Sequence, residues 1–144
     1  MPAPPRSGER ANLRLVGARR TIEQMLAEAR ARLRRLGPRE AHEAVDGGAV
    51  IIDIRPQSLR AEDGVVPGAL WFERNVLEWR CDPSCEARDE RVGGLHRRLI
   101  VMCDEGYTSS LAAASLQELG FDHATDLDGG FQAWRAAGLP VENE

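Results

Sequence analysis

Two largely apolar runs with many β-branched residues stand out along the chain at residues 49–54 and 99–103, and only Asp53 interrupts the first. Neither run alternates apolar with polar positions, which is typical of strands buried on both faces of a parallel sheet. Two short segments, the apolar run 68–72 and the stretch around 124–127, predict two further strands. The chain therefore contains at least four candidate strands, and the central ones have no solvent-facing side.

Segments with helical spacing lie between these strands. We expect helices over 39–45, 108–119 and 131–137 and a helical turn over 75–80, with Thr108 or Ser109 capping the second of them. Strands that alternate with helices predict an α/β fold, in which a parallel sheet is covered by helices on both faces. Residues 81–98 have no clear period and predict an irregular surface excursion.

The N-terminal part of the chain divides in two. Residues 1–20 show no periodicity and predict a flexible tail. Thr21 is a good N-cap, and apolar residues at 22, 25, 26, 29, 33 and 36 share one helical face, so we expect an amphipathic helix within 21–37. The other face carries Arg30, Arg32, Arg34 and Arg35, which either dock on the chain's own domain or contact an acidic partner. The main domain is expected over 38–144.

Composition and charge narrow the class of protein. The 144 residues are 42% hydrophobic and 29% charged, which suits one globular domain. No apolar run approaches the roughly 18 residues that cross a bilayer, so no membrane association is expected. Residues 1–39 carry a net charge of +7 and residues 40–144 a net charge of −11. The acidic main domain argues against a nucleic-acid partner.

The cysteine count and the N-terminus favour a cytoplasmic location. Three cysteines do not make a disulfide framework. The pair Arg19-Arg20 is followed by Thr21-Ile22-Glu23-Gln24 rather than by the apolar stretch of an export signal. An arginine-rich organellar transit peptide remains the alternative.

Cys103 is the candidate nucleophile. Ligands of open α/β sheets bind beyond the carboxyl ends of the strands, and Cys103 ends the predicted strand 99–103. The short connection to the next helix contains Gly106 and can aim several backbone N–H groups at one point. Such a cradle stabilises a thiolate, which is the nucleophilic form of cysteine. The alternative is a buried, inert cysteine at a strand end.

The segment Cys103-Asp104-Glu105-Gly106-Tyr107-Thr108-Ser109 resembles the active-site loop of the rhodanese family. Two further stretches are similar to that family's signatures, namely Ile52-Asp53-Ile54-Arg55 with Val66-Pro67-Gly68-Ala69, and 127–134 with 138–140. The resemblance implies a rhodanese-like fold with about five parallel strands. It also implies a sulfurtransferase in which Cys103 carries a sulfane sulfur as a persulfide, and Thr108, Ser109 and the loop amides bind that sulfur.

From this resemblance we expect no cofactor and no metal. The expected partners are a small sulfur donor and a thiol or cyanide acceptor, with a sulfur-accepting protein as a further candidate. The expected substrate-binding residues are Asp104, Glu105, Gly106, Tyr107, Thr108, Ser109 and, in a register shifted slightly from the family's, Arg60. The competing hypothesis is a rhodanese-like module that carries sulfur, or docks on a protein, without turnover.

Two acidic residues distinguish this loop from those of rhodaneses that favour thiosulfate. Asp104 and Glu105 stand where such enzymes have basic residues, and like charges about 4 Å apart repel by about 1 kcal/mol in water and more in a drier site. Poor thiosulfate turnover and a persulfide donor are therefore expected. Asp53 and Arg55 are interpreted as a structural pair. Leu127, Phe131 and Trp134 are expected in the core.

The cysteines suggest two other chemistries. Cysteine phosphatases need Cys-x5-Arg, because the arginine clamps the phosphoryl oxygens, but position 109 is serine. Cys81 and Cys85, with His96 and His123 elsewhere, offer a weak zinc pattern or a pair of resolving thiols. Otherwise they are incidental surface cysteines.

Overall fold

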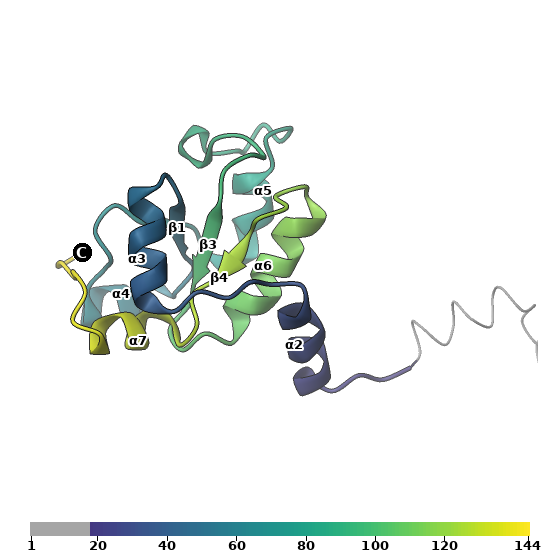
Figure 1. Ribbon diagram of the computed structural model, residues 1–144. Helices are drawn as coiled ribbons and strands as arrows, with labels where there is room; N and C mark the ends of the chain where they lie inside the picture. The colour runs from purple at the N-terminus through teal and green to yellow at the C-terminus, as the bar shows by residue number, and fades with distance from the viewer. Residues whose placement is uncertain (1–17) are drawn as a thin grey trace, which may run out of the picture.

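The computed structural model describes residues 18–144, so most of the expected tail, residues 1–17, lies outside it. Four parallel strands form one sheet in the order β2-β1-β3-β4, and the two apolar runs occupy its centre (Figure 1). About five strands were expected. The fifth position is a single parallel bridge between Leu36 and Leu127 at the β4 edge. The strands are β1 (Val50–Asp53), β2 (Leu70–Trp71), β3 (Leu99–Met102) and β4 (Thr125–Asp126).

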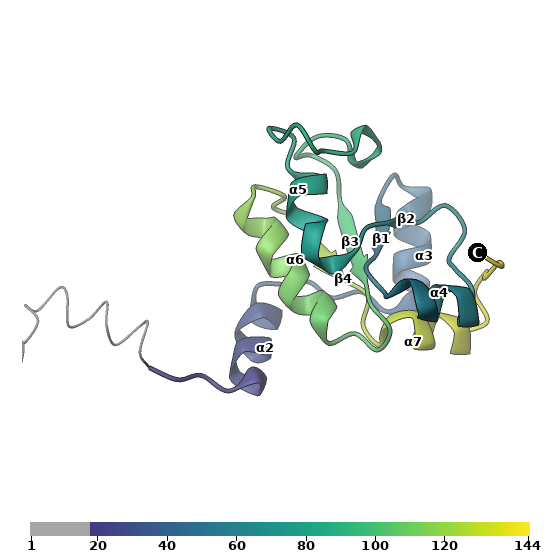
Figure 2. The same ribbon diagram turned by 180° about the vertical axis from the view of Figure 1, so that it is seen from behind.

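Helices cover both faces of the sheet, as the alternation predicted. One face is covered by α3 and α7, and the other by α5 and α6 (Figures 1 and 2). A further helix, α2, packs on α6 beside the β4 edge. The helices are α2 (Ile22–Ala31), α3 (Pro38–Asp46), α4 (Gln57–Asp63), α5 (Leu77–Cys81), α6 (Thr108–Glu118) and α7 (Gly130–Ala136), with short 3-10 helices at Arg74–Val76 and Glu90–Val92. None of the helices in the described part of the chain has the length and apolar character to cross a membrane.

The core consists of two hydrophobic clusters, one on each face of the sheet. Successive residues of a strand point to opposite faces, so Val101 joins the cluster under α5 and α6, while Ile100 joins the cluster under α3 and α7. Leu127, Phe131 and Trp134 are all buried in this second cluster, which confirms the expected core positions.

The N-terminal helix is shorter than predicted. Thr21 caps it as expected, with a capping box to Gln24, but the helix ends at Ala31 rather than near residue 36. Residues 33–36 are extended instead, because the Leu36 N–H donates to the Asp126 carbonyl and the Asp128 N–H donates to the Leu36 carbonyl. Leu33 packs with the first cluster and Leu36 with the second, so their spacing of three does not mark one helical face.

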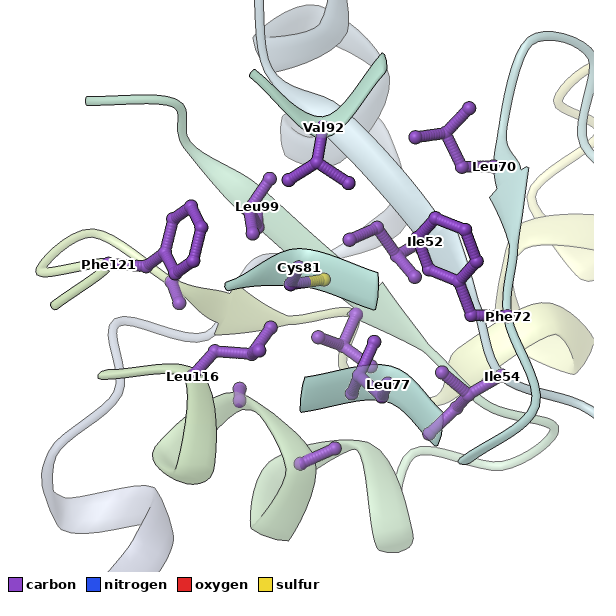
Figure 3. Close-up of a cluster of buried hydrophobic side chains, with 14 of the residues drawn as sticks. Ile52, Ile54, Leu70, Phe72, Leu77, Cys81, Val92, Leu99, Leu116 and Phe121 are labelled. Carbon is purple, nitrogen blue, oxygen red and sulfur yellow. The ribbon is translucent and has the colours of Figure 1, made fainter. Parts of the chain in front are cut away.

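The excursion 81–98 is irregular apart from the turn Glu90–Val92, but it is not wholly on the surface. Cys81 ends α5 and is only 1% exposed, and Val92 is completely buried. Figure 3 shows both side chains within the first cluster, with Cys81 between Leu77 and Leu99 and Val92 beside Leu99. The interpretation of Cys81 as a surface cysteine was therefore wrong.

Candidate functional site

Cys103 follows β3 at the carboxyl end of the sheet and begins a tight loop to α6. Its Sγ atom accepts a hydrogen bond of 3.1 Å from the Gly106 N–H. The side chain is 6% exposed, so the sulfur is sheltered and held by at least one backbone donor. This hydrogen bond is the first element of the backbone cradle that the sequence predicted.

Glycines allow the loop and the start of α7 to pack against each other. Gly106 has a φ of +88°, and a side chain there would meet the Gly129 backbone at 2.7 Å. Gly130 has no room either, because a Cβ atom would lie 2.6 Å from the Cys103 carbonyl oxygen. The Phe131 and Gln132 N–H groups donate to the carbonyls of Cys103 and Asp104. The Gly129-Gly130 turn thus packs against the backbone of the cysteine loop and supports it.

A cavity of about 300 Å³ opens at Cys103. Five predicted site residues line it, namely Cys103, Asp104, Glu105, Tyr107 and Thr108, together with Ile54, Arg55 and Pro56. Asp104 is half-buried and accepts a hydrogen bond from the Gln132 side chain, whereas Glu105 is exposed. The structure therefore brings together the acidic residues and the sulfur, as the sequence indicated.

The Ser109 hydroxyl is used elsewhere. It donates to Oδ2 of Asp126 at 2.8 Å, and the Ser110 hydroxyl donates to the same oxygen at 2.7 Å. Neither Thr108 nor Ser109 caps α6, whose N-cap residue is Tyr107 without a side-chain hydrogen bond. The prediction of the cap was wrong, because the completely buried Asp126 carboxylate engages the first turn of α6. Ser109 anchors that turn rather than presenting its hydroxyl proton to the sulfur.

Two arginines from the N-terminal segment hold the loop from outside. Arg35 forms a double hydrogen bond with Asp126, at 2.9 and 3.2 Å, and donates to the Gly106 carbonyl at 2.9 Å. Arg30 donates to the same carbonyl at 2.8 Å and to the Ser110 hydroxyl at 3.1 Å. Two of the four arginines of this segment therefore dock on the chain's own domain, which is one of the two alternatives expected for them.

The hydrogen bonds from Arg30 and Arg35 orient the peptide group between Gly106 and Tyr107. No peptide of the described chain is cis, and in a trans peptide the carbonyl and the following N–H point in opposite directions. Because the Gly106 carbonyl is turned toward Arg30 and Arg35, the Tyr107 N–H is directed away from them. Burial lowers the pKa of Arg35, but its hydrogen bond with Asp126 and the charges of Asp126, Asp128 and Cys103 outweigh this and raise the pKa.

Asp53 and Arg55 have the geometry expected of a structural pair. Both are 1% exposed, and Arg55 donates to both Asp53 oxygens and to the Gly64 carbonyl. Its guanidinium group lies 3.8 Å from the centre of the Phe131 ring. Arg60, predicted as a donor-binding residue, is not among the residues that line the Cys103 cavity. It pairs with Asp53 and with Glu144 instead.

Cys81 and Cys85 form no metal site within the described residues, where no group of three potential ligands is found. Burial, followed by the charge of Glu78, raises the pKa of the Cys81 thiol to about 12. All three cysteines are free thiols.

Sequence reasoning missed Asp126, Gln132 and the particular contacts of Arg30 and Arg35 with the cysteine loop. The only available signal was the excess of arginine before residue 39, which did not show where each arginine points.

The fold and the loop define a class of protein: an α/β domain with one sheltered cysteine in a backbone cradle at the carboxyl edge of its sheet. The family profile of the rhodanese-like domain matches residues 37–137, and the chain belongs to this family of rhodanese-type sulfurtransferases.

Relatives named thiosulfate sulfurtransferase GlpE support this assignment. The protein from Stutzerimonas stutzeri is 37% identical over 71% of this chain and 84% of its own, and that from Ectopseudomonas mendocina is 38% identical over 72% and 85%. A solved structure from Rhodopseudomonas palustris, described as a protein of unknown function and possible tyrosine phosphatase, is 32% identical. It covers 85% of this chain and 95% of its own, with a TM-score of 0.78.

Proposed function

We propose that Cys103 takes a sulfane sulfur from an organic persulfide, carries it as a cysteine persulfide and transfers it to a thiol. The Cys103 thiolate attacks the outer sulfur of R–S–SH, the S–S bond of the donor breaks and the thiolate R–S⁻ leaves. A second thiolate, or cyanide in the test tube, then attacks the outer sulfur of the persulfide and releases the Cys103 thiolate. No oxidant or reductant is consumed.

One observation carries this proposal: the sheltered Cys103 sulfur accepts a hydrogen bond from the Gly106 amide inside the loop. A persulfide has a terminal sulfur that also carries negative charge, and preorganised backbone donors stabilise such charge without reorganisation. The cavity of about 300 Å³ leaves room above the cysteine for the donor.

The surroundings of the cavity favour an organic donor over thiosulfate. Asp104 and Glu105 at its rim repel a dianion. A neighbouring groove of about 390 Å³ shares Tyr107 and Thr108 with the cavity and is otherwise lined by Ile22, Glu23, Leu26 and Leu111. Its walls are largely apolar, so the carbon skeleton of a persulfide can lie there beside the reacting sulfur.

The decisive experiment measures cyanide-dependent thiocyanate formation with thiosulfate, glutathione persulfide and 3-mercaptopyruvate as donors. We expect the largest kcat/KM with the persulfide and loss of all activity in Cys103→Ser. Cys85→Ser is the matched control and should behave like the parent. Activity that survives in Cys103→Ser would overturn the assignment, and the highest kcat/KM with thiosulfate would overturn the choice of donor.

The second candidate function is a protein that carries sulfur without catalytic turnover. The acidic residues at the rim of the cavity, Asp104 and Glu105, favour it because they repel an anionic donor. A carrier would accept one sulfur from a persulfide and yield one equivalent of thiocyanate without catalytic turnover, so a burst of one equivalent identifies it.

A phosphatase is disfavoured, although the Rhodopseudomonas palustris relative is described as a possible one. Phosphoryl transfer needs an arginine fork on the inside of the loop, and position 109 is serine. Arg30 and Arg35 contact the outward-facing Gly106 carbonyl instead. We expect no turnover of small aryl phosphates in the same assays.

A further inference from the structure

A second pocket, of about 260 Å³, lies at the opposite end of the strands from Cys103. It is lined by Arg32, Arg34, Arg98, Gln117, Asp122, His123, Ala124 and Thr125. Within residues 18–144, none of its three arginines has an ion-pair partner. The pocket therefore concentrates uncompensated positive charge on a domain whose net charge from residue 40 onward is −11.

Sheet register explains why these arginines meet. The parallel bridge between Leu36 and Leu127 extends the sheet at the β4 edge, and Arg34, two residues before Leu36, lines the pocket together with Thr125. Thr125 in turn pairs with Ile100, and Arg98 lies two residues before Ile100. Positions two apart share a face, so both arginines lie on the face of the cluster under α3 and α7. In Figure 1 no helix lies in front of β4 on this side.

Thr125, which lines the pocket, has a buried hydroxyl group without a hydrogen-bond partner among the described residues. The residue is 2% exposed. Buried hydroxyl groups are normally paired, since an unpaired one costs free energy. The Gln117 side chain donates to the Arg32 and Ala124 carbonyls, so the segment that carries the arginines is tied to the pocket wall.

We propose that this pocket is a binding site for a tetrahedral divalent oxyanion, namely a phosphate or a phosphate monoester. With histidine neutral, three guanidinium groups and the Asp122 carboxylate give the lining a net charge of +2, which matches a dianion. Guanidinium groups present planar donor forks that fit phosphate oxygens. The site is separate from the Cys103 cavity, and the two share no lining residue.

The test uses the full chain labelled with 15N, titrated with inorganic phosphate or phosphoserine at constant ionic strength set with chloride. Saturable shifts are expected at the amides of Arg98, Gln117 and Thr125, but not at Gly106. Stronger binding of phosphoserine would identify an ester as the ligand, and stronger binding of phosphate would identify the free ion. Both results support the site.

Variants decide whether the pocket itself is responsible. Arg34→Gln and Arg98→Gln should each weaken binding by about tenfold, since charge-assisted hydrogen bonds that are partly solvated are lost. Arg19→Gln removes the same charge at an exposed position outside the pocket and should leave the affinity unchanged. No saturable binding, equal binding by the Arg34→Gln/Arg98→Gln double variant, or shifts confined to the Cys103 loop would overturn the proposal.

Discussion

Arg35→Leu is the most informative single change, because it separates the support of the loop from the loop itself. It removes the double hydrogen bond to Asp126 and one of the two guanidinium groups on the Gly106 carbonyl. Asp126 then remains completely buried with only two serine hydroxyls as partners. A buried carboxylate without its cation is strongly unfavourable.

Breaking a buried ion pair costs about 3–5 kcal/mol, and because the Arg35 side chain is 17% exposed we expect about 3 kcal/mol. For a domain of this size that corresponds to a fall in Tm of roughly 10 °C. Adding Asp126→Asn removes the stranded charge, so the double variant should regain about 2 kcal/mol relative to Arg35→Leu. Arg88→Leu breaks the exposed pair with Glu90 and should cost less than about 1 kcal/mol.

Urea unfolding, followed by the fluorescence of the buried Trp134, measures these free energies. Additivity of Arg35→Leu and Asp126→Asn within about 0.5 kcal/mol would refute the coupling. A positioning role also requires a kinetic effect at temperatures where the variant is folded. We expect kcat/KM for the persulfide to fall about tenfold in Arg35→Leu, because a small misplacement of the cradle is costly. Unchanged kinetics would limit Arg35 to stability.

Three further predictions concern charge and thiol chemistry. Asp104→Arg with Glu105→Lys should lower the KM for thiosulfate severalfold at low salt and have little effect at high salt; an equal KM at low salt would show that these side chains do not face the donor. Because its pKa is raised to about 12, the Cys81 thiol should react with iodoacetamide at pH 8 far more slowly than the Cys85 thiol. The double variant Cys81→Ala/Cys85→Ser should transfer sulfur at the rate of the parent, both with and without reductant. Hydrogen bonds from arginine lower the pKa of Asp89 from 3.8 to about 2, so its stabilisation is complete above about pH 4 and is lost as the pH falls toward 2. The free energy of unfolding of Asp89→Asn should therefore fall below that of the parent at neutral pH and converge with it near pH 2, and a constant difference across this range would contradict the linkage.

The sheet and most helices could be predicted because their signals are local. Largely apolar runs marked β1 and β3, and glycines marked the ends of α3 and α6 within a residue or two. Residues 32–36 could not be placed in the same way. Leu33 and Leu36 fit a helical face as well as they fit alternation in an extended segment, and the choice depends on pairing with Leu127, which lies 91 residues away.

The site shows the same division between local and distant information. The position of Cys103 and its loop followed from one short stretch of sequence, and five of the predicted residues line the cavity. The direction of the Ser109 hydroxyl could not be predicted from that stretch. The hydroxyl donates to Asp126, and the charge on Asp126 is balanced by Arg35. These contacts join residues that lie far apart in the sequence, so no local pattern of apolar and polar residues predicts them.

The N-terminal segment is therefore part of the site, although the family match begins only at residue 37. Within residues 37–137 the Asp126 carboxylate has two hydroxyl partners and no cation, so the domain alone would bury an uncompensated charge directly behind the cysteine loop. Arg35 supplies that cation, and it shares the Gly106 carbonyl with Arg30. The residues that follow Cys103 are acidic rather than basic, and the positive charges of Arg30 and Arg35 contact the loop at the outward-facing Gly106 carbonyl, where they support the cradle without lining its mouth.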